Sequence, residues 1–183
     1  SSAFNNAGQR CSALRVLYMQ EDIAERVIEL LIGAMDQLVI GDPAKLITDV
    51  GPVISAQAQQ ALEAHVSGWQ QRGALLHQCQ LPGSCSTGLF VAPALIEITA
   101  IDQLHEEHFG PVLHLVRYHR SEFDKILSAI NATGYGLTFG FHSRIEHSIR
   151  LVEQKIKAGN LYINRDTIGA VVGSQPFGGS GLS

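Results

Sequence analysis

Hydrophobic and polar positions alternate along this chain in two patterns, short apolar runs typical of strands and longer amphipathic stretches typical of helices. The first run, from Leu14 to Met19, predicts a strand. Apolar residues then recur at helical spacing from Ile23 to Leu38, and Asp22 is placed to cap that helix. The breakers Gly41-Asp42-Pro43 follow. The pattern therefore predicts a strand and then a helix that ends before position 41.

A helix and further extended segments follow. Ser55 is a suitable N-cap for a helix that stops at Gly73, and the residues from Ala74 to His77 predict a short strand. The turn-rich segment from Cys79 to Gly88 predicts a surface loop. The apolar segment from Phe90 to Thr99 predicts extended structure.

The second half of the chain continues the alternation of strands and helices. We expect strands at 112–118, 137–141 and 161–164, and helices at 121–131 and 144–158. This order predicts an α/β domain with a mostly parallel, open sheet flanked by helices, in which the strand ends face the reactive site. The glycine-rich tail from Gly169 to Ser183 predicts a loop that needs a substrate or a further domain to pack against.

Composition narrows the class of protein. The 183 residues are 45% hydrophobic and 16% charged, which fits one compact domain. A formal net charge of -4 gives no basic surface for nucleic acid. No apolar stretch approaches the ~18 residues of a membrane span. The chain begins without an initiator methionine or a signal-peptide pattern, so we expect a piece of a longer protein.

The cysteines and histidines show no metal-ligand spacing. Cys11, Cys79 and Cys85 are odd in number and lack a paired CxxC pattern, so the sequence predicts neither disulfides nor a zinc site, and we expect no bound metal. A reducing, cytoplasmic location follows from the same cysteine usage. The histidines are scattered, and each is expected to be a surface or core residue. They are His65, His77, His105, His114, His119, His142 and His147, and nothing is inferred from His108.

Cys11 stands apart because it lies between a glycine turn at Gly8 and the apolar strand. A free thiol has a pKa near ~8.5, so a nucleophilic cysteine needs help from its surroundings. Arg10 and nearby backbone amides are candidates for that help. A buried structural thiol is the commoner fate of a single cysteine. Cys79 and Cys85 have no comparable context and are interpreted as incidental.

Three separate segments resemble the aldehyde dehydrogenase superfamily. They are Phe4 with Gly8-Gln9-Arg10-Cys11-Ser12-Ala13, then Glu106-Glu107-His108-Phe109-Gly110-Pro111, and Gln175-Pro176-Phe177-Gly178-Gly179. The resemblance implies oxidation of an aldehyde through a cysteine thioester with NAD or NADP. It also implies that residues 1–183 form one catalytic-domain fragment, from which the NAD-binding region of the family is absent.

The resemblance assigns roles to individual residues. Cys11 attacks the aldehyde, and its own backbone amide is one donor to the oxyanion; the second donor, an asparagine, and the glutamate that activates water lie upstream in the family. Glu107 binds the ribose and Phe109 supports the nicotinamide of NAD, while Phe177 lines the aldehyde pocket. The alternative for Glu107 is a solvated acidic surface, and the alternative for both phenylalanines is plain packing. No phosphate-binding glycine motif occurs in the chain.

The finer resemblance is to L-glutamate γ-semialdehyde dehydrogenases, and above all to the dehydrogenase part of bifunctional proline utilization enzymes. It implies that Ser12 and the backbone amides of Gly169 and Ala170 bind the α-carboxylate of the substrate, as an anion nest of amides and a hydroxyl would. Other members carry serine where this chain has Ala170, so only the amide of Ala170 can contribute. The resemblance further implies a homo-oligomeric parent with an FAD-dependent proline dehydrogenase region, which is absent from this chain.

Other functions stay open at this point. A dehydrogenase of another acidic semialdehyde, such as succinic semialdehyde, is one alternative, because the same nest accepts any carboxylate. A non-catalytic binding or assembly module that keeps the fold is the alternative from a different class. A cysteine hydrolase is a third reading, but no motif pairs a histidine with Cys11.

Overall fold

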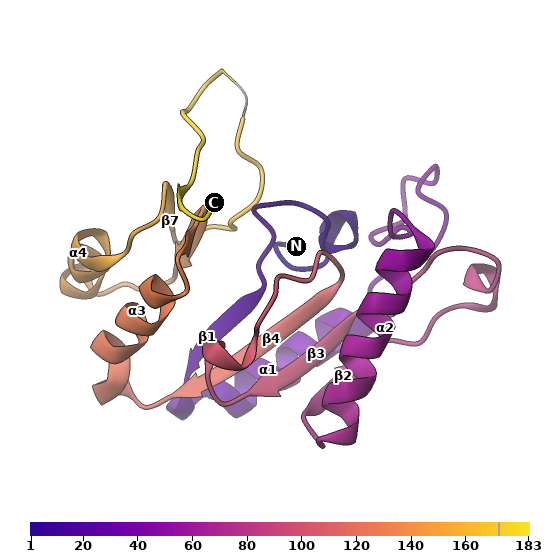
Figure 1. The fold of residues 1–183 in the computed structure, drawn as a ribbon, viewed down its shortest axis with the longest axis horizontal. Helices are drawn as coiled ribbons and strands as arrows, with labels where there is room; N and C mark the ends of the chain where they lie inside the picture. The colour runs from indigo at the N-terminus through magenta and orange to yellow at the C-terminus, as the bar shows by residue number, and fades with distance from the viewer. Residues whose placement is uncertain (172) are drawn as a thin grey trace.

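The core of the protein is a four-stranded sheet. The computed structural model describes residues 1–171 and 173–183. The strands lie in the order β1, β4, β3 and β2 (Figure 1). Parallel pairing joins β1 to β4 and β4 to β3, whereas β2 is antiparallel to β3. The bounds are β1 Val16–Gln20, β2 Leu75–Gln78, β3 Ala94–Ile98 and β4 Val112–Tyr118. The expectation of an α/β fold with a mostly parallel sheet is confirmed.

Two long helices cover this sheet. Helix α1, Glu21–Asp36, packs on β1 and β4, and helix α2, Ala56–Gln71, packs on β2 and β3. In the view of Figure 1, α1 lies behind the sheet and α2 in front of it. The central strands β3 and β4 are almost entirely buried between them, which explains their continuous apolar runs.

The N-cap predicted from the sequence is confirmed for α2 but not for α1. Ser55 caps α2 as predicted, because its hydroxyl oxygen accepts a hydrogen bond from the amide of Ala58 at 3.1 Å. The prediction that Asp22 caps α1 is wrong, since the helix begins one residue earlier, at Glu21, with Gln20 as the flanking extended residue. Asp22 therefore lies in the first turn, where a carboxylate favours the positive end of the helix dipole.

The remaining elements form a second group beside the sheet, seen in orange and yellow in Figure 1. The parallel pair of β6 and β7 is accompanied by two helices, and a short antiparallel pair joins β5 to β8. The bounds are α3 Phe123–Ala132, β5 Tyr135–Gly136, β6 Thr138–Phe141, α4 Glu146–Lys155, β7 Asn160–Ile163 and β8 Ser180–Gly181. Both helices are shorter than the sequence pattern predicts.

The strands thus belong to three separate sheets within the described residues, and the sequence pattern missed the two short strands β5 and β8. Strand pairing depends on contacts far apart in the sequence, which local patterns do not encode. The tail is held by the chain itself: the amide side chain of Asn160 donates to the carbonyl of Gly178 at 2.8 Å. No helix among the described residues has the length and apolar character needed to cross a bilayer.

Candidate active site

Cys11 lies on a tightly turned loop at the start of the chain. Three successive residues before it, Asn6, Ala7 and Gly8, have left-handed backbone, with φ of 57°, 51° and 64°. This conformation is unfavourable for residues with a side chain. The loop places Cys11 at the surface and buries its neighbour Ser12. The exposure of this thiol and the constrained backbone before it favour a nucleophilic role for Cys11 over a structural role in the core.

The loop of Cys11 packs directly against the segment that contains Glu107. A Cβ atom added to Gly8 would lie 2.0 Å from the carbonyl oxygen of Gly110, so the two glycines allow the backbones to meet. Gly110 is equally constrained from the other side, because a Cβ there would lie 2.3 Å from Cδ2 of Leu62 on α2. Two of the three sequence motifs are therefore in contact, although about a hundred positions separate them.

Gln9 fixes the same loop to a third segment. Its side-chain nitrogen donates to the carbonyl of Pro52 at 3.2 Å, and its side-chain oxygen accepts from the amide of Ile54 at 2.8 Å. A glutamine amide can make both bonds at once because it carries a donor and an acceptor. Gln9 thus holds the loop against the segment, with Pro52 and Ile54, that leads into α2.

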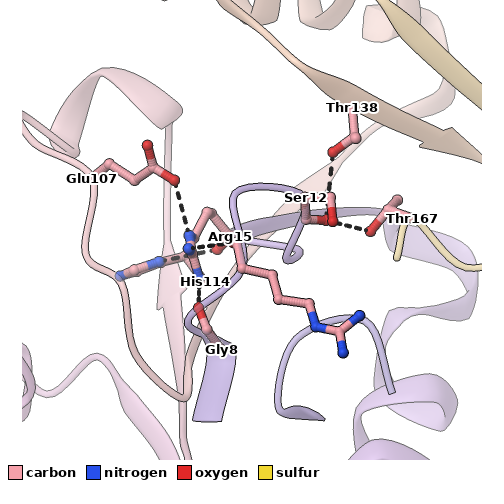
Figure 2. A network of polar contacts seen from close by, with 8 residues as sticks. Gly8, Ser12, Arg15, Glu107, His114, Thr138 and Thr167 are labelled. Atoms are coloured by element: carbon pink, nitrogen blue, oxygen red, sulfur yellow. Dashed lines mark hydrogen bonds and ion pairs between the residues drawn. The ribbon is translucent and has the colours of Figure 1, made fainter. Parts of the chain in front are cut away.

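Arg15 is the centre of the polar network shown in Figure 2. Its guanidinium donates to the carbonyl oxygens of Gly8 and Arg10, the latter at 3.0 Å, and to Oε1 of Glu107 at 3.2 Å. It also lies over the ring of Phe109, 4.6 Å from the ring centroid. One side chain therefore connects the Cys11 loop with both proposed cofactor-binding residues.

The guanidinium group of Arg15 is partly buried. Burial lowers its pKa below the ordinary value, and the hydrogen bond and charge of Glu107 oppose that shift. An arginine stays charged through such a shift, so Glu107 faces a permanent cation. Arg10 was the expected cation near the nucleophile. In the structure, the side chain of Arg15 reaches the loop instead and donates to the backbone carbonyl of Arg10.

A cluster of three histidines lies behind Arg15. The Nε2 atoms of His65 and His114 are 2.8 Å apart, and Nδ1 of His114 lies 3.1 Å from the carbonyl oxygen of Arg15. The rings of His65 and His108 are 3.8 Å apart at their centroids. Burial, more than the neighbouring charges, lowers the pKa of His65 to about 3 and that of His114 to about 4. The pair is therefore neutral at physiological pH and can share one hydrogen bond.

The proposed carboxylate-binding residues approach each other through Thr167. The carbonyl of Ser12 accepts hydrogen bonds from the hydroxyl groups of Thr167 at 3.0 Å and Thr138 at 3.5 Å (Figure 2). Thr167 precedes Gly169 by two positions, and Gly169 adopts left-handed backbone with φ of 88°. Ser12, Gly169 and Ala170 thus belong to one region of the molecule.

Phe177 is less firmly placed at this site. It lies on the tail, is 44% exposed, and is followed by Gly178, which is anchored to Asn160. A Cβ on Gly159 would lie 1.8 Å from the carbonyl oxygen of Gly178, so the tail approaches the β7 region closely. The tail therefore has a defined attachment one residue after Phe177.

The accessible residues fit part of a dinucleotide. The Glu107 side chain is 31% exposed and Phe109 is 44% exposed, so a ribose and a nicotinamide can reach them. Only one carboxylate oxygen of Glu107 is bonded to Arg15, which leaves the other free to accept from a hydroxyl group. The described residues contain no glycine-rich phosphate loop, so they fit the nicotinamide riboside end alone.

Sequence reasoning missed Arg15, His114 and Thr167. Arg15 is a charged residue at the entry to an apolar strand, and His114 is a polar residue inside one; both exceptions to the pattern were visible but carried no indication of a partner. Tyr162 is a further surprise, because its hydroxyl is buried and has no hydrogen-bond partner among the described residues.

Known proteins of one family match this chain over its whole length. The sequence profile of the Aldehyde dehydrogenase family matches residues 1–183. The bifunctional protein PutA of Klebsiella aerogenes is 50% identical over 188 residues, which cover 100% of this chain and 14% of that protein. The 1-pyrroline-5-carboxylate dehydrogenase of Geobacillus thermodenitrificans is 35% identical over 185 residues, which cover 100% of this chain and 35% of that enzyme.

Solved structures agree with these sequence matches. A crystal structure of a Bradyrhizobium japonicum proline utilization A (PutA) mutant superposes with a TM-score of 0.94 at 52% identity, covering 100% of this chain and 18% of that one. A 1-pyrroline-5-carboxylate dehydrogenase from Thermus with bound NAD gives a TM-score of 0.87 at 35% identity, covering 99% of this chain and 34% of that one. The chain spans well under half the length of these relatives.

Proposed function

Because the chain belongs to the aldehyde dehydrogenase family, we propose that it carries the nucleophile of an enzyme that oxidises L-glutamate γ-semialdehyde to L-glutamate in proline breakdown. Relatives named 1-pyrroline-5-carboxylate dehydrogenase support this substrate, since that cyclic imine hydrolyses to the semialdehyde. The observation that carries the proposal is the exposed Cys11 on a loop held against the Glu107–Gly110 segment by Gly8 and Arg15.

The first step is attack by the Cys11 thiolate on the aldehyde carbon. A bond forms between Sγ and that carbon, and the electron pair of the carbonyl bond moves to its oxygen. The backbone amide of Cys11 donates a hydrogen bond to this oxyanion. The fixed geometry of the loop keeps the donor in place before the charge develops, which is how such a donor lowers the barrier.

Glu107 and Phe109 would position the acceptor of the hydride. NAD, the cofactor bound in the related Thermus structure, would accept the hydride from the former aldehyde carbon, leaving a thioester on Cys11. Glu107 would accept hydrogen bonds from the ribose, and Phe109 would support the nicotinamide face. Arg15 holds both side chains in relation to the Cys11 loop.

Hydrolysis of the thioester completes the reaction. Water adds to the acyl carbon, the carbon–sulfur bond breaks, and the sulfur leaves as the thiolate that begins the next cycle. By analogy with the family, the glutamate that activates this water and the asparagine that joins the oxyanion hole lie upstream of the segment matched here. This chain accordingly supplies the nucleophile but depends on the rest of the enzyme for a complete cycle.

Recognition of the substrate rests on its charged end. Ser12 with the amides of Gly169 and Ala170 would bind the α-carboxylate, and Phe177 would line the path of the aldehyde carbon chain. The hydrogen bond between Thr167 and Ser12 supports this assignment because it brings the two segments together. The left-handed backbone of Gly169 is the kind of conformation in which successive amides form an anion-binding nest.

The complete protein is proposed to be bifunctional. The relatives named Bifunctional protein PutA support a parent with a second activity. The family resemblance further implies that this activity is an FAD-dependent proline dehydrogenase and that the parent is a homo-oligomer. In such a parent, residues 1–183 form the cysteine-bearing part of the dehydrogenase domain, and the NAD-binding region lies outside them.

The test compares two acidic semialdehydes as substrates of the full-length protein. We expect NADH formation from L-glutamate γ-semialdehyde with a kcat/KM at least tenfold above that for succinic semialdehyde. Equal or reversed preference would overturn the substrate assignment. Absence of NADH from both aldehydes, with NAD shown to bind, would favour a non-catalytic module that keeps the fold.

A further inference from the structure

A second group of reactive side chains lies away from Cys11, where the end of α1 meets the end of β2. Asp36 is the last residue of α1, His77 lies on β2, and Cys79 follows that strand directly. Nε2 of His77 and Oδ1 of Asp36 are 2.7 Å apart. One ligand atom from each residue lies within 4.8 Å of those from the other two.

This group faces a hollow of about 320 Å³. Cys79 is buried among the residues that line it, and its thiol donates a hydrogen bond to the carbonyl oxygen of Met35 at 3.4 Å. The His77 side chain is 22% exposed and that of Asp36 is 51% exposed, so solvent reaches the group from one side. Three donors are thus held by folded elements, and the hollow leaves room for water as a further ligand.

The three side chains offer a metal ion three kinds of donor atom. Asp36 has a carboxylate oxygen, His77 a ring nitrogen and Cys79 a sulfur, all within 4.8 Å of one another. Within the described residues, no lysine or arginine pairs with the carboxylate of Asp36. A divalent metal ion would supply a positive charge here, since it binds a thiolate and a carboxylate together and displaces the thiol proton.

We propose that Asp36, His77 and Cys79 form a binding site for a zinc-like divalent transition metal ion. Sulfur and imidazole donors select borderline-soft ions over Mg²⁺ and Ca²⁺, which prefer oxygen ligands. Tetrahedral bonds of about 2.0–2.1 Å to nitrogen and oxygen and about 2.3 Å to sulfur require the His77–Asp36 distance to widen to about 3.3 Å. The separations from Sγ of Cys79, which lie within 4.8 Å, would settle at about 3.6 Å. The exposed side chain of Asp36 can make that small movement.

No sequence motif indicates this site, because its three ligands lie at irregular spacing along the chain. His77 and Cys79 are two positions apart at a strand end, where alternate residues share a face, but Asp36 precedes His77 by 41 positions. Only the packing of α1 against the sheet brings the carboxylate to the strand. A metal ion here would fasten the end of α1 to the edge strand β2.

Cobalt(II) is a suitable probe because tetrahedral Co²⁺ absorbs visible light and a cobalt–thiolate bond adds a charge-transfer band. We expect the metal-stripped full-length protein to bind Co²⁺ with both signatures. Cys79→Ala should abolish the thiolate band assigned to this site, and Asp36→Asn and His77→Gln should each weaken binding at least tenfold. Cys11→Ala and Cys85→Ala are the matched thiol controls and should leave the band unchanged.

Several outcomes would overturn the proposal. They are the absence of a thiolate band in the unsubstituted protein, its persistence at full strength in Cys79→Ala, and its loss in Cys11→Ala, which would place the metal on the proposed nucleophile. Because Asp36 is half exposed, Asp36→Asn should fold even if a substitution of the buried Cys79 does not. Unchanged Co²⁺ affinity in a folded Asp36→Asn protein would therefore also refute the site.

Discussion

Arg15 connects more of the candidate active site than any residue that the sequence motifs identified. It bonds to two carbonyls of the Cys11 loop and to Glu107, and it covers the ring of Phe109. Those contacts need the planar fork of a guanidinium, which a lysine ammonium cannot reproduce. Arg15 is therefore a positioning residue, acting through the groups that it holds.

Replacing Arg15 by lysine should impair the use of NAD while keeping the positive charge. A lost charge-assisted hydrogen bond costs about 1.5–3 kcal/mol, so kcat/KM for NAD should fall about 10- to 100-fold, mainly through KM. Steady-state kinetics of the full-length protein measure this effect. Arg10→Lys is the control, because the Arg10 side chain is exposed. Equal KM values for NAD in Arg15→Lys and the unsubstituted protein would contradict the positioning role.

His114 provides a prediction about pH. Its folded-state pKa, about 4, lies below the ordinary value of 6.5, so the unfolded chain takes up a proton first as pH falls. The stability associated with neutral His114 is complete above pH 6.5 and is lost as pH falls toward 4. Each such group reduces the free energy of unfolding by at most about 1.4 kcal/mol per pH unit. His65 adds in the same direction, but its greater exposure reduces its share.

The pH prediction can be checked by urea unfolding of the full-length protein across this range. His114→Gln should be less stable at neutral pH but should lose less further stability as pH falls from 6.5 toward 4. His147→Gln, which alters an exposed histidine, should leave the slope unchanged. The idea fails if His114→Gln and the unsubstituted protein lose stability in parallel.

At the level of elements, the site depends on contacts between segments rather than on any single motif. The sequence predicted most strands and both long helices, because their apolar periodicity is strong and local. It could not predict which strands pair, and it missed β8, a two-residue strand created by pairing with β5. Nor could it predict that Gly8 and Gly110 meet, since each glycine alone is compatible with an ordinary turn.

The contact between Gly110 and Leu62 gives a prediction at this scale. Gly110→Ala inserts a methyl group where Leu62 lies, and such overpacking typically costs about 1–3 kcal/mol. Leu62→Ala alone leaves a cavity and costs about 2–5 kcal/mol. The smaller side chain at position 62 makes room for the new methyl group. The double variant should therefore lose less stability than the sum of the losses in the two single variants.

Thermal melting of the three variants measures this coupling. Gly8→Ala serves as a contrast, because its methyl group would strike the backbone oxygen of Gly110 and its left-handed φ would remain strained. Leu62→Ala should not rescue it. Strict additivity of Gly110→Ala and Leu62→Ala would show that the two residues do not pack as described.

For the whole molecule, the fold brings the first two motifs together and joins them to the loop before Gly169, whereas Phe177 of the third motif lies on the tail. Phe4 to Ala13 and the segment with Glu107 are in direct contact, and Thr167 ties Ser12 to the loop before Gly169. The site residues predicted from the sequence have types and neighbours that match a family pattern, and their roles stay predictions. It did not predict the connecting residues, since Arg15, Thr167 and Asn160 act through partners that are remote in sequence.

The central claim is that Cys11 is the nucleophile, and its most direct test is NADH formation by full-length Cys11→Ala. We predict that this variant loses turnover of L-glutamate γ-semialdehyde by several orders of magnitude while it still binds NAD, because only the attacking sulfur is removed. Cys85→Ala, which alters a buried thiol, should keep turnover within a few-fold of the unsubstituted protein. Turnover retained in Cys11→Ala would contradict the account.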